Sequence, residues 1–365
     1  MTNKFWPRNR GKLIRDAVTL YVGGQAFTGW ESVNITKDLG SICNSFSVVF
    51  HDKYQSFKTP WPLKPGLEFQ AQIGSATVCT GYIEKLETGF GTGSRQFTIS
   101  GRSKPGDLVD CSVTGDMEYS NLSLDALARK LVEPFGLKVL LSVIPSIIDK
   151  FSVKPGETVF EALDRAARMQ GYMWVSTRHG NIRLTRAARA RAYSEIHQDA
   201  NMLSGSISVD TTQRHDAYTV IGQTFGSDEF NSAAAASPTG SASDNGVFRH
   251  RPLTIIAEGP VNSDQAASRA QWEAANRIAK GQEVRVTVQG WQQEDKSLWG
   301  INQVVRLKSR FLGLNTDLLT TSVEHIKGND TGTITNITLV RADSFSPQPT
   351  IPASSDPLTF LGPYF

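Results

Sequence analysis

Short alternating runs of apolar and polar residues dominate the first hundred residues of the chain. Six such runs lie between Ala17 and Asp107, among them AVTLYV, SFSVVF and RQFTIS, and their β-branched and aromatic content is typical of half-buried strands. Glycine-containing turn sequences such as GGQ and GTGS separate them. Many short strands at close spacing favour a barrel or a sandwich, so residues 1–108 predict a first β-barrel domain.

The middle of the chain has apolar residues at helical spacing instead. In NLSLDALARKLVEPFG the apolar stripe follows Ser123, a candidate N-cap, and Gly136 can end the helix. The same order returns with Thr158 and Gly171, because Thr158 minus Ser123 and Gly171 minus Gly136 both give 35. A strand is expected after each glycine, and NIRLTR forms a further one. Residues 109–204 therefore predict an α/β domain with two helix-Gly-strand units.

Strand-like runs return from about residue 205, beginning with SGSISVD, AYTVIGQ and RPLTIIAEG. Residues 226–246, between the last two runs, are small and polar and predict a flexible loop. One helix, starting at Asn262 or Ser263 and closing at Gly281, precedes four more strands. Residues 205–345 therefore predict a second β-barrel domain that carries one helix and this loop.

A hairpin of the first β-rich segment resembles one of the second. Ile83–Ser100 and Val323–Val340 align without a gap at an offset of 240, and their apolar positions coincide. Only two of the eighteen aligned pairs are identical, so chance similarity between amphipathic hairpins is one explanation. The other is a duplicated barrel, which the equivalent place of the hairpins favours. The predicted fold is mainly β with an α/β insert (α+β): two similar β-barrel domains separated by an α/β region.

Composition narrows the class of protein. A chain of 365 residues exceeds one ordinary core, and 39% hydrophobic with 20% charged residues describes a soluble globular protein. Cys43, Cys79 and Cys111 are odd in number and form no CxxC pair, so reduced thiols are expected. Because the sequence lacks an apolar run of about 20 residues and an N-terminal signal segment, we expect folding in a cytoplasm without membrane insertion.

Charge gives little reason to expect nucleic-acid binding. The 38 basic and 35 acidic residues leave a formal net charge of +3. One run, RHGNIRLTRAARARA, is rich in arginine between Arg178 and Arg191. It predicts either a solvated edge or a contact with an acidic partner surface or a polyanion.

The sequence contains no recognisable catalytic constellation. The six histidines lack metal-ligand spacing, and neither a GxSxG elbow nor a phosphate-binding loop is present. Carboxylate pairs such as Glu84 with Glu87, or Glu294 with Asp295, could serve glycoside hydrolysis only if they faced each other across a cleft. We therefore predict no catalytic residue, no metal site and no cofactor.

Six residues are candidates for contact with a partner or with another copy of the chain. Two are tryptophans that fit a core or an interface anchor, and four belong to a proline-rich, extended C-terminal tail, residues 346–365, which is too apolar for a mere tail. The alternative for that tail is that it packs back on its own chain. The candidates are Trp291, Trp299, Phe360, Leu361, Tyr364 and Phe365.

Several spread-out motifs resemble the baseplate hub proteins of Mu-like contractile-tailed phages. The segment KPGETVFEALDRAARMQGY is also similar to late-control proteins and to the hubs of type VI secretion spikes. The resemblance covers roughly Ala17 to Ala342, and its motifs are structural positions without a reactive centre. They are Val18–Gly24, Arg251–Pro252, Ala270–Ala274, Gly290–Trp291 and Trp299–Asn302.

This resemblance implies a homotrimeric ring that adapts a six-fold tail tube to a three-fold central spike. The implied partners are further copies of the chain, the tail tube protein, the spike protein and other baseplate proteins, with DNA only in transit through a channel. The implied location is the virion tail baseplate, assembled in the bacterial host cytoplasm. Two alternatives stay open: the hub of a secretion spike or phage-tail-like bacteriocin, and a β protein that binds or hydrolyses cell-wall carbohydrate.

Overall fold

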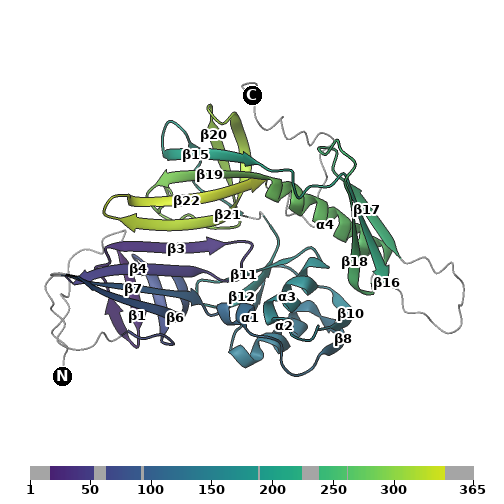
Figure 1. The fold of residues 1–365 in the computed structure, drawn as a ribbon, viewed down its shortest axis with the longest axis horizontal. Coiled ribbons are helices and arrows are strands. Elements are labelled where there is room, and N and C mark those ends of the chain that lie inside the picture. The colour runs from purple at the N-terminus through teal and green to yellow at the C-terminus, as the bar shows by residue number, and fades with distance from the viewer. Residues whose placement is uncertain are drawn as a thin grey trace, which may run out of the picture.

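The computed structural model is mainly β, with two β-rich modules side by side and an α/β region that comes between them in the sequence (Figure 1). It describes residues 17–52, 63–91, 94–187, 190–223, 238–260 and 262–341. Within these ranges, every helix is too short or too polar to cross a bilayer.

The first module is an antiparallel arrangement of seven strands in the order β3-β4-β7-β6-β5-β1-β2. Alternation along each strand directs one row of side chains, including Ile35, Phe69 and Ile99, into its core. The strands are β1 (Val18–Val22), β2 (Gln25–Phe27), β3 (Ser32–Asp38), β4 (Ser45–Asp52), β5 (Glu68–Ile73), β6 (Ala76–Gly91) and β7 (Ser94–Ser103).

The second module repeats this strand order as β15-β19-β22-β21-β20, with β13 and β14 beyond β20. Each strand has a counterpart at the same place in the first module, so β15 corresponds to β3 and β21 to β6. One difference is that β13 and β14 run parallel to β20, whereas β1 is antiparallel to β5. The strands are β13 (Ala190–Arg191), β14 (Ile196–His197), β15 (Met202–Val209), β19 (Gln282–Gln289), β20 (Gln303–Ser309), β21 (Leu314–Gly328) and β22 (Gly332–Arg341).

The two modules are joined edge to edge by antiparallel pairing of β3 with β21. The result is one 14-stranded sheet, and the pairing among the described strands contains no closed ring. The sequence predicted two separate barrels. The structure differs because β21 is long enough to pair with β20 along its first part and with the other module along its second.

The ungapped alignment of the two hairpins is wrong at the level of residues. Ile83 lies opposite Gly101 across the first hairpin, whereas Val323 lies opposite Ile337, which the 240-residue offset would equate with Phe97. The β-bulges give a different offset: Lys85 and Ser322, the first paired residues after them, differ by 237, so the 240-residue alignment is shifted by three positions on this strand. The equivalence of the modules is therefore one of strand order and bulge position.

The α/β region lies between the modules in sequence and packs around its own core. The capping box predicted to start its second helix is present, with Thr158 Oγ1 accepting from Glu161 N–H, and Gly136 and Gly171 have positive φ where the helices end. Ser123 bonds to Asp125 instead of capping the backbone. The elements are α1 (Gly106–Asp110), β8 (Glu118–Ser123), α2 (Leu124–Val132), the 3-10 turn η1 (Glu133–Phe135), β9 (Val139–Leu141), β10 (Ile147–Ser152), α3 (Val159–Arg168), β11 (Met173–Ser176) and β12 (Ile182–Thr185).

The α/β region ends earlier than the predicted boundary at residue 204. The short strands β13 and β14 and the start of β15 already belong to the large sheet. Two-residue strands carry too few positions to show alternation, so no sequence pattern marks this change.

A three-stranded sheet and one long helix form an insertion between β15 and β19. The elements are β16 (Ala217–Gln223), β17 (Thr239–Ser243), β18 (Pro252–Pro260) and α4 (Ser263–Gly281), which confirms the predicted helix. The predicted loop 226–246 is wrong for Thr239–Ser243, because that segment pairs with β16. Its Gly240 lets α4 approach closely, since a Cβ there would lie 2.1 Å from the Ala267 nitrogen.

Candidate assembly surface

The junction between the modules, which we call the seam, is the pairing of β3 with β21 over Val33–Asp38 and Ser322–Lys327. The side chain of Trp291 contacts both modules at this junction. Trp291 belongs to the loop after β19 of the second module, yet it is 1% exposed and packs in the core of the first module. Its Nε1–H donates to the carbonyl oxygens of Ile326 and Ile334, both at 2.9 Å. Trp291 therefore holds both modules together.

A buried histidine lies beside this tryptophan in the seam. His325 is 0% exposed, and its ring stands edge-on to Trp291 with 6.1 Å between ring centroids. Burial, and to a smaller extent the positive charge of nearby Lys37, lower the pKa of His325 to about 3. His325 is therefore neutral in the folded protein at neutral pH, and the seam contains a group that water would charge in mild acid.

The opposite face of the sheet carries a ladder of polar side chains across the seam. Thr287 donates to Asn336 Oδ1 at 2.9 Å, and Asn336 Nδ2 donates to Glu324 at 2.9 Å. The other oxygen of Glu324 accepts from Asn34 Nδ2 at 2.6 Å, and Thr36 Oγ1 donates to Asn34 Oδ1 at 3.1 Å. The ladder thus runs over β19, β22, β21 and β3, and one carboxylate ties the two modules together.

Replacing that carboxylate tests the ladder. Glu324→Ala leaves the amides of Asn34 and Asn336 without their acceptor, and a hydrogen bond to a charged group contributes about 1.5–3 kcal/mol. Because the ladder is only half-buried, we expect a loss of about 1–2 kcal/mol in the free energy of unfolding, measured by urea titration. The control is Glu195→Ala, because Glu195 is exposed and pairs with Lys308 away from the ladder; it is expected to leave the urea midpoint nearly unchanged. Equal losses in the two variants would contradict the role of the ladder.

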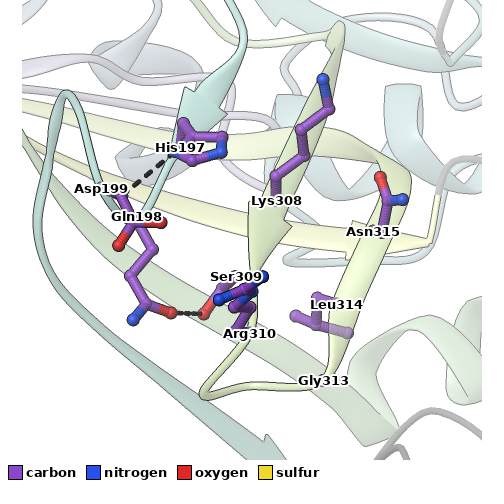
Figure 2. Close-up of a pocket in the computed structure, with 9 residues that line it drawn as sticks. All are labelled: His197, Gln198, Asp199, Lys308, Ser309, Arg310, Gly313, Leu314 and Asn315. Atoms are coloured by element: carbon purple, nitrogen blue, oxygen red, sulfur yellow. Dashed lines mark hydrogen bonds between the residues drawn. The ribbon is translucent and has the colours of Figure 1, made fainter.

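A hollow in the second module is lined by residues of β14, β20 and β21 and by the loops beside them, and its basic side chains, Lys308 and Arg310, outnumber its one acidic side chain (Figure 2). The Asp199 N–H donates to His197 Nδ1 at 3.1 Å, and Ser309 Oγ donates to Gln198 Oε1 at 2.7 Å. Lys308 lines the same hollow, and Asp199 is the single carboxylate among its lining residues. The hollow therefore lacks the paired acids that glycoside hydrolysis requires.

Three of the four carboxylates considered from the sequence, those of Glu84, Glu87 and Asp295, make surface contacts. Glu84 accepts from Arg102 Nε at 2.8 Å with both oxygens, and Glu87 pairs with Lys85. Hydrogen bonds from Ser297 hold the pKa of Asp295 below its usual range. A general acid needs a raised pKa, so this group is unsuited to that role. In the described ranges, His, Cys, Asp and Glu side chains form no group of three that could hold a metal ion.

The predicted contact residues fall into two sets. Trp291 and Trp299 are 1% and 2% exposed and pack in the cores of the first and second module, so both are anchors inside this chain rather than surface contacts. The remaining candidates, Phe360, Leu361, Tyr364 and Phe365, lie outside the described residues.

The arginines of the basic run make separate local contacts. Arg191 pairs with Asp317 through two hydrogen bonds, Arg186 stacks on Tyr172, and Arg178 bonds to the neighbouring His179. The described part of the run therefore does not form one basic patch. The residues missed by the sequence reading are those of the ladder and His325, whose only sequence signal is a polar position within a strand.

Family comparisons match three successive parts of the chain. Residues 17–103 match the N-terminal part of Mu phage baseplate assembly protein GpP-like proteins, and residues 262–348 match the fourth domain of Mu phage baseplate assembly protein GpP. Residues 105–186 match the second domain of baseplate hub protein gp44-like proteins. The three matches agree with the first module, the α/β region and most of the second module.

Whole-chain relatives extend this agreement. The chain is 31% identical to baseplate hub protein gp44 of Escherichia phage Mu over 353 residues, which are 94% of this chain and 91% of that protein. The 43 kDa tail protein of prophage MuSo2 from Shewanella oneidensis has a similar structure, with a TM-score of 0.81, 27% identity and coverage of 91% of this chain and 100% of that one. A tail protein of Neisseria meningitidis shares the fold, with a TM-score of 0.80, 24% identity and coverage of 91% and 98%.

Proposed function

This chain belongs to the family of Mu-like phage baseplate hub proteins, and on that premise we propose that three copies close into a ring between a six-fold tail tube and a three-fold spike. The repeated strand order of the two modules is the observation that carries the proposal. Three chains, each with two equivalent modules, present six similar units while keeping three-fold symmetry. One ring can then match both partners.

The seam supports an edge-to-edge arrangement of the modules. Inside one chain, β3 of the first module already pairs with β21 of the second, so two modules can join without a linker strand between them. The same kind of contact between chains would continue the sheet around the ring and leave no edge open.

We propose that the polar face of this sheet lines the channel through which DNA passes. Along the ladder the side chains are hydroxyls and amides, and its one carboxylate is bonded to two amides. Tight DNA binding requires several lysines or arginines on the phosphates, and such contacts would hold the DNA in place. A hydrogen-bonded, weakly charged wall suits passage instead.

The other assignments follow from the same premise. We propose a structural, non-enzymatic role in the tail baseplate of the virion, with assembly in the host cytoplasm and contacts to the tube, the spike and other baseplate proteins. The C-terminal residues Phe360–Phe365 stay candidates for contact with a neighbouring subunit. A secretion-spike or bacteriocin hub is the second candidate, because a component of an E. coli type VI secretion system shares the fold with a TM-score of 0.56 at 9% identity.

The mass of the purified chain in solution tests the ring. Light scattering at low and moderate salt is expected to give about 120 kDa, which is three times the 40.0 kDa of the chain. A mass of 40 kDa at every protein concentration and salt would contradict a ring that forms unaided. Peptidoglycan binding or hydrolysis by such a monomer would favour the carbohydrate-active alternative.

A further inference from the structure

We infer that the outer edge of β15 pairs, antiparallel, with the second half of β6 in the next copy of this chain. This inference rests on the proposed ring and names the contact by which that ring would close. The seam joins β21 of the second module to β3 of the first. Their counterparts in the other module are β6 and β15, and neither has a partner among the described strands at the place where β21 and β3 pair.

The first unmatched half is on β6, the counterpart of β21. On β21, Leu314–Leu319 pairs with β20 and Ser322–Lys327 pairs with β3. On β6, pairing with β5 ends at Tyr82, and no described strand occupies the same side beyond it. Phe90 projects from this part of β6 with 94% of its surface exposed. The segment has the place of the seam in its module but lacks a partner strand.

The second unmatched half is on β15, the counterpart of β3. β3 is paired on both sides, with β4 and β21, whereas β15 is paired only with β19 among the described strands. Its sequence MLSGSISV contains no charged residue and no proline, and Leu203 is 58% exposed. Edge strands that stay in water usually carry charges or proline against unwanted pairing, so this edge has the composition of a covered strand.

The β-bulges of the two modules fix the register of this pairing. The extra residue lies between Ile83 and Lys85 on β6 and between Thr320 and Ser322 on β21, so alignment of the bulges places Lys85 at Ser322. Four residues further along each strand, Gly89 of β6 is therefore equivalent to Ile326 of β21.

The same alignment assigns the opposite strand. Asn34 faces Ser47, which faces Ser100, and Ser206 faces Arg285, which faces Thr338. Ser100 faces Lys85 and Thr338 faces Ser322, the residues just after the two bulges, so Ser206 has the place of Asn34. Because Asn34 lies opposite Ile326 in the seam, Ser206 is expected opposite Gly89 of the next chain.

This register covers the exposed ring of Phe90. Phe90 falls opposite Gly205 and diagonal to Ile207, and diagonal neighbours on one face of a sheet are within reach of an aromatic ring. Leu203 lies beside this row, as the extra residue of a bulge between Met202 and Ser204. Ser206 and Gly89 fall on the polar face and would continue the row of small polar side chains around the channel.

A disulfide between chains tests the pairing at the level of residues. The variant Ser206→Cys with Gly89→Cys, in a Cys111→Ser background, uses an exposed serine and a glycine whose Cβ would meet nothing within 4 Å. Directly opposite residues in an antiparallel pair have Cα atoms about 4.5–5.5 Å apart, within disulfide range. Mild oxidation is expected to convert most of the protein into covalent dimers and trimers on a non-reducing gel.

The matched control is Ser206→Cys with Lys85→Cys in the same background, because Lys85 lies on the same face about 13 Å further along the strand. This pair and each single variant are expected to stay monomeric on the gel. A trimer by light scattering without cross-linking of the 206–89 pair would leave the proposed ring standing and overturn this contact. Equal cross-linking of both pairs would overturn the register, and a chain that never trimerises would overturn the ring itself.

Discussion

Trp291→Ala is expected to lower the free energy of unfolding by about 3–5 kcal/mol, the range for removing a large buried aromatic side chain. The loss comes from an emptied site in the first module and from two carbonyl oxygens, of Ile326 and Ile334, that lose their donor. Because the side chain comes from the second module, we also expect the seam to open more often than the strands around it. Amide hydrogen exchange should accelerate in β3 and in Ser322–Lys327 of β21.

Two variants separate this effect from a general loss of stability. Trp299→Ala empties a site in the core of the second module only, so it should reduce the urea midpoint without a selective rise of exchange in the seam. Tyr193→Ala changes a side chain that is 67% exposed and should leave both measurements nearly unchanged. If exchange in β3 rises equally in Trp291→Ala and Trp299→Ala, then Trp291 is an ordinary core residue.

Mild acid is expected to destabilise the protein through His325. The pKa of this histidine is about 3 when folded and close to 6.5 when unfolded, so between these values the unfolded chain binds a proton that the folded chain does not. The contribution of His325 to stability is therefore complete above pH 6.5 and is lost as the pH falls toward 3. Between pH 6.5 and pH 4 the loss amounts to about 3 kcal/mol.

Carboxylates also titrate in this range, so the prediction concerns a difference between variants. His325→Phe keeps a ring beside Trp291 and removes the ionisable group, and its stability should fall about 3 kcal/mol less than that of the unchanged protein between pH 6.5 and 4. His179→Gln, at an exposed histidine, should keep the full dependence. Parallel stability curves for His325→Phe and the unchanged protein, from urea titrations at each pH, would show that His325 is not buried neutral.

The helices α2, α3 and α4 could be predicted because their signals are local, whereas the five-residue helix α1 was not predicted. Thr158 and Glu161 lie three residues apart and form a capping box, and Gly136 and Gly171 mark helix ends through positive φ. The segment Thr239–Ser243 was mistaken for a loop because threonine, glycine, serine and alanine carry no apolar alternation. It becomes a strand through its contact with α4.

The seam could not be predicted, because its partners are far apart in the sequence. Asn34 and Glu324 are separated by 290 residues, and nothing in the neighbourhood of either residue specifies the other. The same applies to Trp291, whose sequence context suits a core or an interface equally. The structure shows that Trp291 is a core residue of the first module. This burial depends on how the two modules pair, which the local sequence does not specify.

The bulge at Thr321 has an evolutionary consequence for strand β21. Residues before it pair with β20 of the second module, and residues after it pair with β3 of the first module across the seam. A one-residue insertion or deletion here would turn His325 and the ladder carboxylate to opposite faces of the sheet. Lineages of this chain should therefore gain and lose residues in the turns that follow β6 and β21, while the spacing from Leu319 to His325 stays constant.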